Sequence, residues 1–88
     1  MKITFDALKD TVNIDKHGIT LAAANQLEWD TLWTMPDTRH DHGENRQIGY
    51  AYIGLRLYCV VFTDRDESRR IISLRKANNR EINHYANT

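Results

Sequence analysis

Two groups of basic side chains in this sequence could contact a phosphate. The first is the segment 69–77, where four of nine residues are Arg or Lys and alternate with apolar residues. Alternation with period 2 predicts a strand with one buried face, and a strand fixes the directions in which its cations point. Positioned guanidinium groups suit phosphate binding. The same pattern is also typical of a solvated basic edge strand, so both readings stay open at this point.

The second group lies on one face of a helix predicted over residues 7–17. Its members recur at i, i+4, i+7 and i+8, the spacing of one helix side: Lys9, Asn13, Lys16 and His17. Two cations, an amide and an imidazole could together bind an anion. The alternative is that Lys16 and His17 only complement the negative end of the helix dipole.

Other reactive residue types give weaker signals. His40 and His42 lie in the polar loop 37–44 without the spacing or the Cys partners of a zinc site, so no metal is predicted. Arg46 follows this loop and enters a predicted strand, which makes it a better anchored cation than Arg39. Cys59 is the only Cys and lies in an apolar run, which predicts a buried thiol. No Gly-rich phosphate loop, nucleophile elbow or carboxylate pair is present, so no cofactor is predicted.

Charge and composition narrow the class of protein. The net charge is zero, with five Lys and Arg against eight Asp and Glu in residues 1–55, and seven against four in residues 56–88. A neutral total argues against strong non-specific binding to nucleic acid, while the basic second half permits a local anion site. Neither a signal-peptide core nor a run long enough to cross a bilayer is seen, which predicts a cytoplasmic protein with no membrane contact.

The local signals predict one α+β domain over residues 1–88. Asp6 caps the helix over 7–17 and Gly18 ends it; Thr20 caps a short helix over 21–27. Strands are predicted over 47–53, 56–63 and 69–75, with weaker ones over 1–5 and 32–35. Asn78 and Glu81 form a capping box that opens a final helix to residue 86. The expected architecture is a small antiparallel sheet of about four strands packed against the N-terminal helices and a C-terminal helix.

The order of motifs goes further than the individual elements. The sequence carries Asp6-x-x-Lys9-x-x-x-Asn13-x-x-Lys16-His17-Gly18-Ile19, then Pro36-Asp37-x-x-His40-x-x-Gly43-Glu44-x-Arg46, and finally Arg70-Ile71-Ile72-Ser73-x-Arg75-Lys76-Ala77-x-x-x-Glu81-x-x-x-Tyr85. This order resembles the BrnT family of bacterial toxins over nearly the whole chain. The chain departs from the family in having Phe5 where Trp is common and in a less basic final helix.

The resemblance implies a toxin of a type II toxin–antitoxin system with a RelE-like fold. Such toxins are endoribonucleases that arrest translation. They are neutralised by a cognate antitoxin, typically a ribbon-helix-helix protein, through which any DNA contact runs. Two alternatives remain at this point: a non-catalytic module that binds only its antitoxin, and a toxin that acts on a protein such as gyrase, as the related ParE branch does.

The hypothesis for the chemistry is metal-independent RNA cleavage through attack of the 2′-hydroxyl on the adjacent phosphorus. His17 would transfer the proton, and Lys16 would position the scissile phosphate. Three cations would stabilise the transition state: Arg46, Arg75 and Lys76. Because an extended backbone points neighbours to opposite faces, Lys76 could join Arg75 only if the strand bends or ends there. Further substrate contacts are expected from Lys9, Asn13, His40 and Arg70.

Trp29 and Trp33 stand four residues apart beside Leu32. Stacking on a base is one use of such residues. At this spacing they more often belong to a core or a partner interface, and we expect them on the surface that meets the antitoxin.

Overall fold

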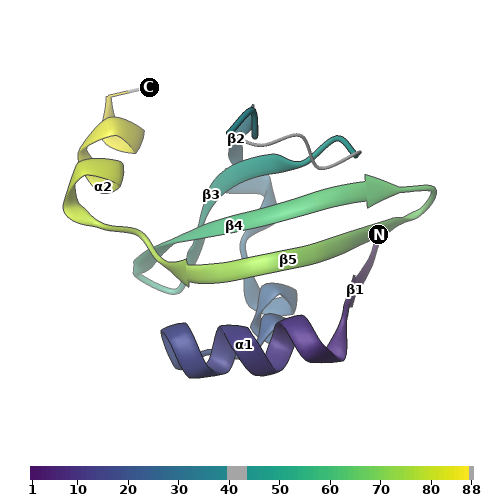
Figure 1. Cartoon of the computed structure of the whole chain (residues 1–88). Coiled ribbons are helices and arrows are strands. Elements are labelled where there is room, and N and C mark those ends of the chain that lie inside the picture. The colour runs from purple at the N-terminus through teal and green to yellow at the C-terminus, as the bar shows by residue number, and fades with distance from the viewer. Residues whose placement is uncertain (40–43, 88) are drawn as a thin grey trace.

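Five strands form one sheet in the computed structural model, which describes residues 1–39 and 44–87 (Figure 1). The order across the sheet is β1-β5-β4-β3-β2. The strands are β1 (Lys2–Phe5), β2 (Trp33–Pro36), β3 (Gln47–Ile53), β4 (Arg56–Arg65) and β5 (Ser68–Lys76). The helical elements are α1 (Ala7–His17), the 3₁₀ turns η1 (Leu21–Gln26) and η2 (Trp29–Thr31), and α2 (Asn79–Ala86). The predicted α+β class is confirmed.

The sheet is mixed rather than purely antiparallel. Strands β2 to β5 pair antiparallel, as predicted. The N-terminal strand β1 adds a fifth strand and pairs parallel with the first half of β5, from Lys2 beside Ser68 to Phe5 beside Ile71. This long-range pairing leaves the second half of β5 without a strand partner on that side.

The ends of α1 and α2 follow the predicted caps. The Asp6 carboxylate accepts hydrogen bonds from the backbone N–H of Leu8 (2.8 Å) and of Lys9 (3.2 Å). Gly18 has a left-handed backbone with φ 70°, and its N–H donates to the carbonyl of Ile14. At α2, Asn78 and Glu81 each bind the other's backbone N–H, so the capping box is confirmed.

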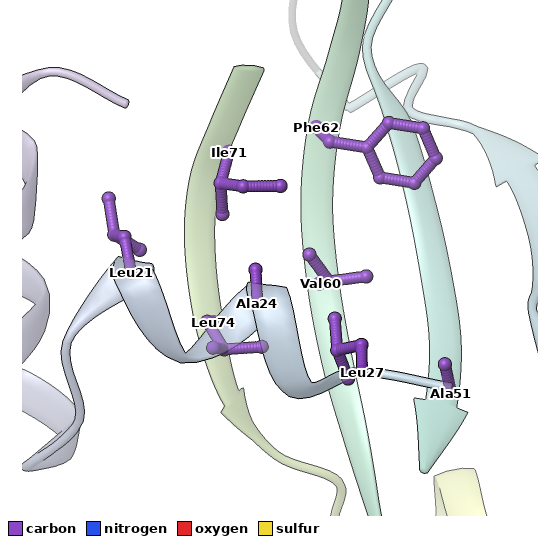
Figure 2. Packing of buried hydrophobic residues seen from close by; sticks show 8 residues of the cluster. All are labelled: Leu21, Ala24, Leu27, Ala51, Val60, Phe62, Ile71 and Leu74. Carbon is purple, nitrogen blue, oxygen red and sulfur yellow. The ribbon is translucent and has the colours of Figure 1, made fainter. Parts of the chain in front are cut away.

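The main core lies between η1 and one face of the sheet. Figure 2 shows the side chains of Leu21 and Ala24 in η1, and of Leu27 directly after it, packed against strands β3, β4 and β5. The strands contribute Ala51, Val60, Phe62, Ile71 and Leu74. The segment predicted as a helix over 21–27 is a tight 3₁₀ turn, capped by Thr20 as expected. We call this the η1 face of the sheet.

A second, smaller cluster lies on the other face, which we call the α2 face. Its buried residues are Tyr50, Leu57, Cys59 and Ala77, and Ile82 and Tyr85 of α2 pack against them. The predicted burial of the Cys59 thiol is confirmed. Helix α2 lies at the end of the sheet where β5 ends, so the rest of this face is not covered by a helix (Figure 1).

Helix α1 takes the place of a strand beside the second half of β5 (Figure 1). The amide of Asn13 donates to the carbonyl of Leu74 (2.8 Å) and accepts from its N–H (3.1 Å). Its second N–H binds the carbonyl of Ile19 (2.9 Å). Asn13 is only 4% exposed. Its side chain therefore provides hydrogen-bond partners for backbone groups at the edge of β5 that would otherwise be buried without any.

Within the described part of the chain, no helix is long and apolar enough to cross a membrane.

Replacing Asn13 with Ala should destabilise the fold by about 3 kcal/mol, because it leaves buried backbone groups of Leu74 and Ile19 unpaired. Urea unfolding followed by circular dichroism measures this loss. The matched control is Asn25→Ala, since Asn25 makes one exposed bond to the carbonyl of Ala22. We expect a change there of no more than about 0.5 kcal/mol. Equal unfolding midpoints for the two variants would contradict the role given to Asn13.

Candidate phosphate-binding site

Residues of three strands share the α2 face next to the edge that α1 covers. In the register of the sheet, Val61 stands opposite Ser73, Cys59 opposite Arg75, and Tyr50 opposite Cys59. Directly paired residues project from the same face. Because Cys59 and Tyr50 belong to the cluster on the α2 face, Arg75 and Ser73 lie on that face too.

A hollow of about 270 Å³ lies between α1 and β5, and we call it the α1 hollow. It is lined by Lys9, Val12, Asn13, Lys16, His17 and, from β5, Ile72 and Ser73. Lys9, Lys16 and His17 are exposed to solvent. The structure therefore brings together the three basic residues that the spacing on the first helix singled out.

A second hollow of about 110 Å³ lies on the α2 face, and we call it the Arg75 hollow. Its polar lining comes from Arg39, Tyr50, Cys59, Ser73, Arg75 and Glu81. Ser73 lines both hollows, so the two share one wall. His17 and Arg75 thus lie in neighbouring depressions, not at opposite ends of the molecule.

Arg75 is held in a fixed orientation by Glu81 of α2. Two parallel hydrogen bonds join its Nη1 and Nη2 to Oε1 and Oε2 of the carboxylate, at 2.8 and 2.9 Å. Glu81 also accepts from the backbone N–H of Asn78 and from the hydroxyl of Tyr50. The bonds from Arg75 lower the pKa of Glu81 to about 2, and those to Glu81 raise the pKa of Arg75. Burial, above all, raises the pKa of Tyr50.

Arg39 is the site residue that sequence reasoning missed. Its Nε and Nη2 donate to the Asp37 carboxylate at 2.9 and 3.1 Å, and these bonds raise the pKa of the guanidinium. The Asp37 side chain is 1% exposed, against 63% for Arg39, so the carboxylate lies behind the cation. The signal in the sequence was an Asp two residues before an Arg, directly after the strand that ends at Pro36.

Arg46 and Arg70 line neither hollow. Arg46 donates to Glu44 through Nε at 2.9 Å. This bond, more than any other influence, lowers the pKa of Glu44, with smaller contributions from the charges of Arg70 and Arg65. The cations nearest to Glu44 are thus Arg46, Arg65 and Arg70. Arg70 lies near the start of β5, whereas Arg75 lies near its end. The structure therefore does not bring Arg46 or Arg70 together with Arg75.

Two further predicted residues are not available at the hollows. Asn13 lines the α1 hollow, but both of its amide hydrogens are already donated to backbone carbonyls. Lys76 pairs with Tyr58, whose side chain packs against the core of the η1 face. No bend brings Lys76 to the side of Arg75. Asn13 and Lys76 are therefore not among the proposed substrate contacts. His40, which was also predicted to contact the substrate, lies outside the described residues.

The two tryptophans lie on opposite faces of the sheet. Trp29 packs against the η1-face core, edge-to-face with Phe62, and its Nε1 donates to the carbonyl of Ala24. Trp33 packs on the α2 face beside Tyr50 and His84. A single partner surface containing both indoles is therefore not proposed.

The structure is a small α+β domain in which two adjoining hollows are lined by basic side chains. Residues 5–81 match the sequence model of the BrnT family, the ribonuclease toxins of type II toxin–antitoxin systems. The chain therefore belongs to this family, as its motifs indicated, and such a toxin has an antitoxin as its partner. The arrangement is compatible with the RelE-like fold that the resemblance implies. No curated protein matches the chain.

The Glu81 ion pair gives a pH dependence of stability with a defined sign. The folded-state pKa of about 2 lies below the ordinary value of 4.5, so the stabilisation is complete above pH 4.5 and is lost as the pH falls towards 2. Glu81→Gln should therefore cost about 2 kcal/mol at pH 7 and much less at pH 2.5. Unfolding by urea at the two pH values tests this. A cost independent of pH would show that the charge of Glu81 is not involved.

Proposed function

We propose that the protein is a metal-independent endoribonuclease toxin that acts in the cytoplasm and is neutralised by a ribbon-helix-helix antitoxin. The observation that supports this best is the α1 hollow, where Lys9, Lys16 and His17 surround one space that adjoins Arg75. An imidazole beside two ammonium groups supplies a proton-transfer group and positive charge for a phosphodiester.

In the proposed reaction, the 2′-hydroxyl of the substrate is the nucleophile. His17 accepts its proton as the 2′ oxygen bonds to phosphorus, and the bond from phosphorus to the 5′ oxygen breaks. The 5′ oxygen takes a proton from the imidazolium or from water. The products are a 2′,3′-cyclic phosphate and a 5′-hydroxyl, so the protein needs no covalent intermediate and no nucleophile of its own.

The cations of the two hollows have separate tasks in this proposal. Lys16, in the last turn of α1, contacts the scissile phosphate together with Lys9. Arg75 adds positive charge from the adjoining hollow, with its orientation fixed by Glu81. A well-placed donor of this kind lowers a transition state by about 3 kcal/mol.

His17→Ala should lower the rate of RNA cleavage at least about 100-fold, because it removes the proton-transfer group. The measurement is cleavage of a fluorescent RNA by the purified toxin in the presence of EDTA. The matched control is Lys2→Ala, since Lys2 is an exposed cation that lines neither of the two hollows. We expect cleavage by the control within about twofold of the unchanged protein.

Three outcomes of this assay would overturn parts of the proposal. Intact RNA with the unchanged toxin would favour a non-catalytic module or a protein target. Cleavage abolished by EDTA would contradict metal independence. Full activity of a folded His17→Ala variant would remove the imidazole from the mechanism.

The proposal also predicts how the protein meets DNA. With a net charge of zero, the toxin alone should not retard its operator DNA, because non-specific binding depends on neutralising phosphates with excess positive charge. The complex with its antitoxin should retard it. An electrophoretic mobility assay with toxin, antitoxin and their mixture tests this, and retardation by the toxin alone would contradict it.

A further inference from the structure

We infer that the Arg75 hollow is a second phosphate subsite, in which Arg39 and Arg75 hold the phosphate next to the one in the α1 hollow. The inference rests on the proposed function and makes it more specific. It gives the substrate as a strand bound through two successive phosphates, one in each hollow. It also gives Arg39, a residue that no motif singled out, a direct contact with the substrate.

The orientation of the two guanidinium groups favours an anion in the Arg75 hollow. Each is fixed by a carboxylate that is more deeply buried: the side chain of Arg75 is 34% exposed against 15% for Glu81. Asp37 lies still deeper behind Arg39. The bonds to these carboxylates hold each planar guanidinium in one orientation, and Nη1 of Arg75 also donates to the carbonyl of Lys76 at 3.2 Å.

Each of the two guanidinium groups also keeps an N–H group for a ligand. Within the described residues, Nη1 of Arg39 has no hydrogen-bond partner, and the same holds for Nε of Arg75. Both guanidinium groups line this hollow; the bonds to Asp37 raise the pKa of Arg39, and the charge of Arg75 acts weakly in the opposite direction. Two like charges at one hollow are held together by their carboxylates, and an anion between them would relieve their repulsion.

The Arg75 hollow lies next to the proposed site of cleavage. Ser73 lines both hollows, so the α1 hollow and the Arg75 hollow adjoin at this residue. In RNA, one ribose separates consecutive phosphates. A strand crossing Ser73 could therefore place one phosphate beside Lys16 and the next between Arg39 and Arg75.

The Glu81 carboxylate also lines this hollow, and its charge must be considered. Both of its oxygens already accept two hydrogen bonds each, from Arg75, Asn78 and Tyr50. The carboxylate is thus saturated and turned towards its donors. Together with Asp37 it cancels the net charge of the two cations, so this subsite selects phosphate by directed bonds more than by net charge.

The probe for this inference is adenosine 3′,5′-bisphosphate, which carries the two phosphates of one RNA residue and has no bond that the proposed reaction cleaves. Isothermal titration calorimetry compares it with the 3′- and 5′-monophosphates. We expect the bisphosphate to bind the unchanged protein at least tenfold more tightly than either monophosphate. In Arg39→Ala this advantage should disappear, while monophosphate binding in the α1 hollow remains.

Two further variants keep the test decisive. Arg39→Gln retains an N–H donor for Asp37, so it removes the charge even if Arg39→Ala does not fold, and it should also lose the advantage. Arg80→Ala, an exposed α2 residue that lines neither hollow, should keep it in full. Equal affinities for the three nucleotides, or an unchanged advantage in Arg39→Gln, would overturn the inference.

The binding test of the Arg75 hollow and the RNA cleavage test of the proposed function can fail independently of each other. A tenfold advantage that depends on Arg39, in a protein that leaves RNA intact, would support the subsite and refute the nuclease. RNA cleavage without this advantage would support the nuclease and refute the subsite.

Discussion

The pairing between the Asn13 amide and the backbone of Leu74 is the contact on which the rest of the structure depends. Strand β1 covers only the first half of β5, and a β-strand edge buried without partners is costly. Asn13 supplies one donor and one acceptor, as a neighbouring strand would. A helix can therefore lie where a sixth strand would otherwise be needed.

This substitution of helix for strand is what creates the candidate site. A strand at the same place would present alternate residues to the two faces of the sheet. The helix instead presents Lys9, Lys16 and His17 together on the side that meets Ser73. Because Asn13 fixes α1 to a residue one position before Arg75, the α1 hollow and the Arg75 hollow keep a constant relation to each other.

The electrostatics of the site depend on directed bonds more than on accumulated charge. Arg39 and Arg75 each have a carboxylate behind them, and the whole chain is neutral. An enzyme with this balance is expected to bind nucleic acid weakly in general and to select a strand whose phosphates match its fixed donors. This accords with the proposed RNA substrate, because weak general binding to polyanions leaves the toxin available for a strand that fits both hollows.

The parts of the fold that could be predicted from the sequence depend on neighbouring residues. The caps at Asp6 and Asn78, the left-handed Gly18 and the bounds of β3 follow from local chemistry, and all were found. The parallel pairing of β1 with β5 could not be predicted, because it joins residues more than sixty positions apart. The same limit explains the site: Lys9, Lys16 and His17 share one helix, whereas Arg39 meets Arg75 only through the folded sheet. The position of Lys76, in contrast, could be predicted from local sequence, because neighbouring residues of a strand point to opposite faces and Lys76 follows Arg75 directly.

The most direct test of the account is a crystal structure with a short RNA whose cleaved linkage is blocked by a 2′-deoxy nucleotide. We predict one phosphate in the α1 hollow, in contact with Lys16 and His17, and the next phosphate bound by Arg39. A strand that instead follows the cations around Glu44, with both hollows empty, would contradict the account.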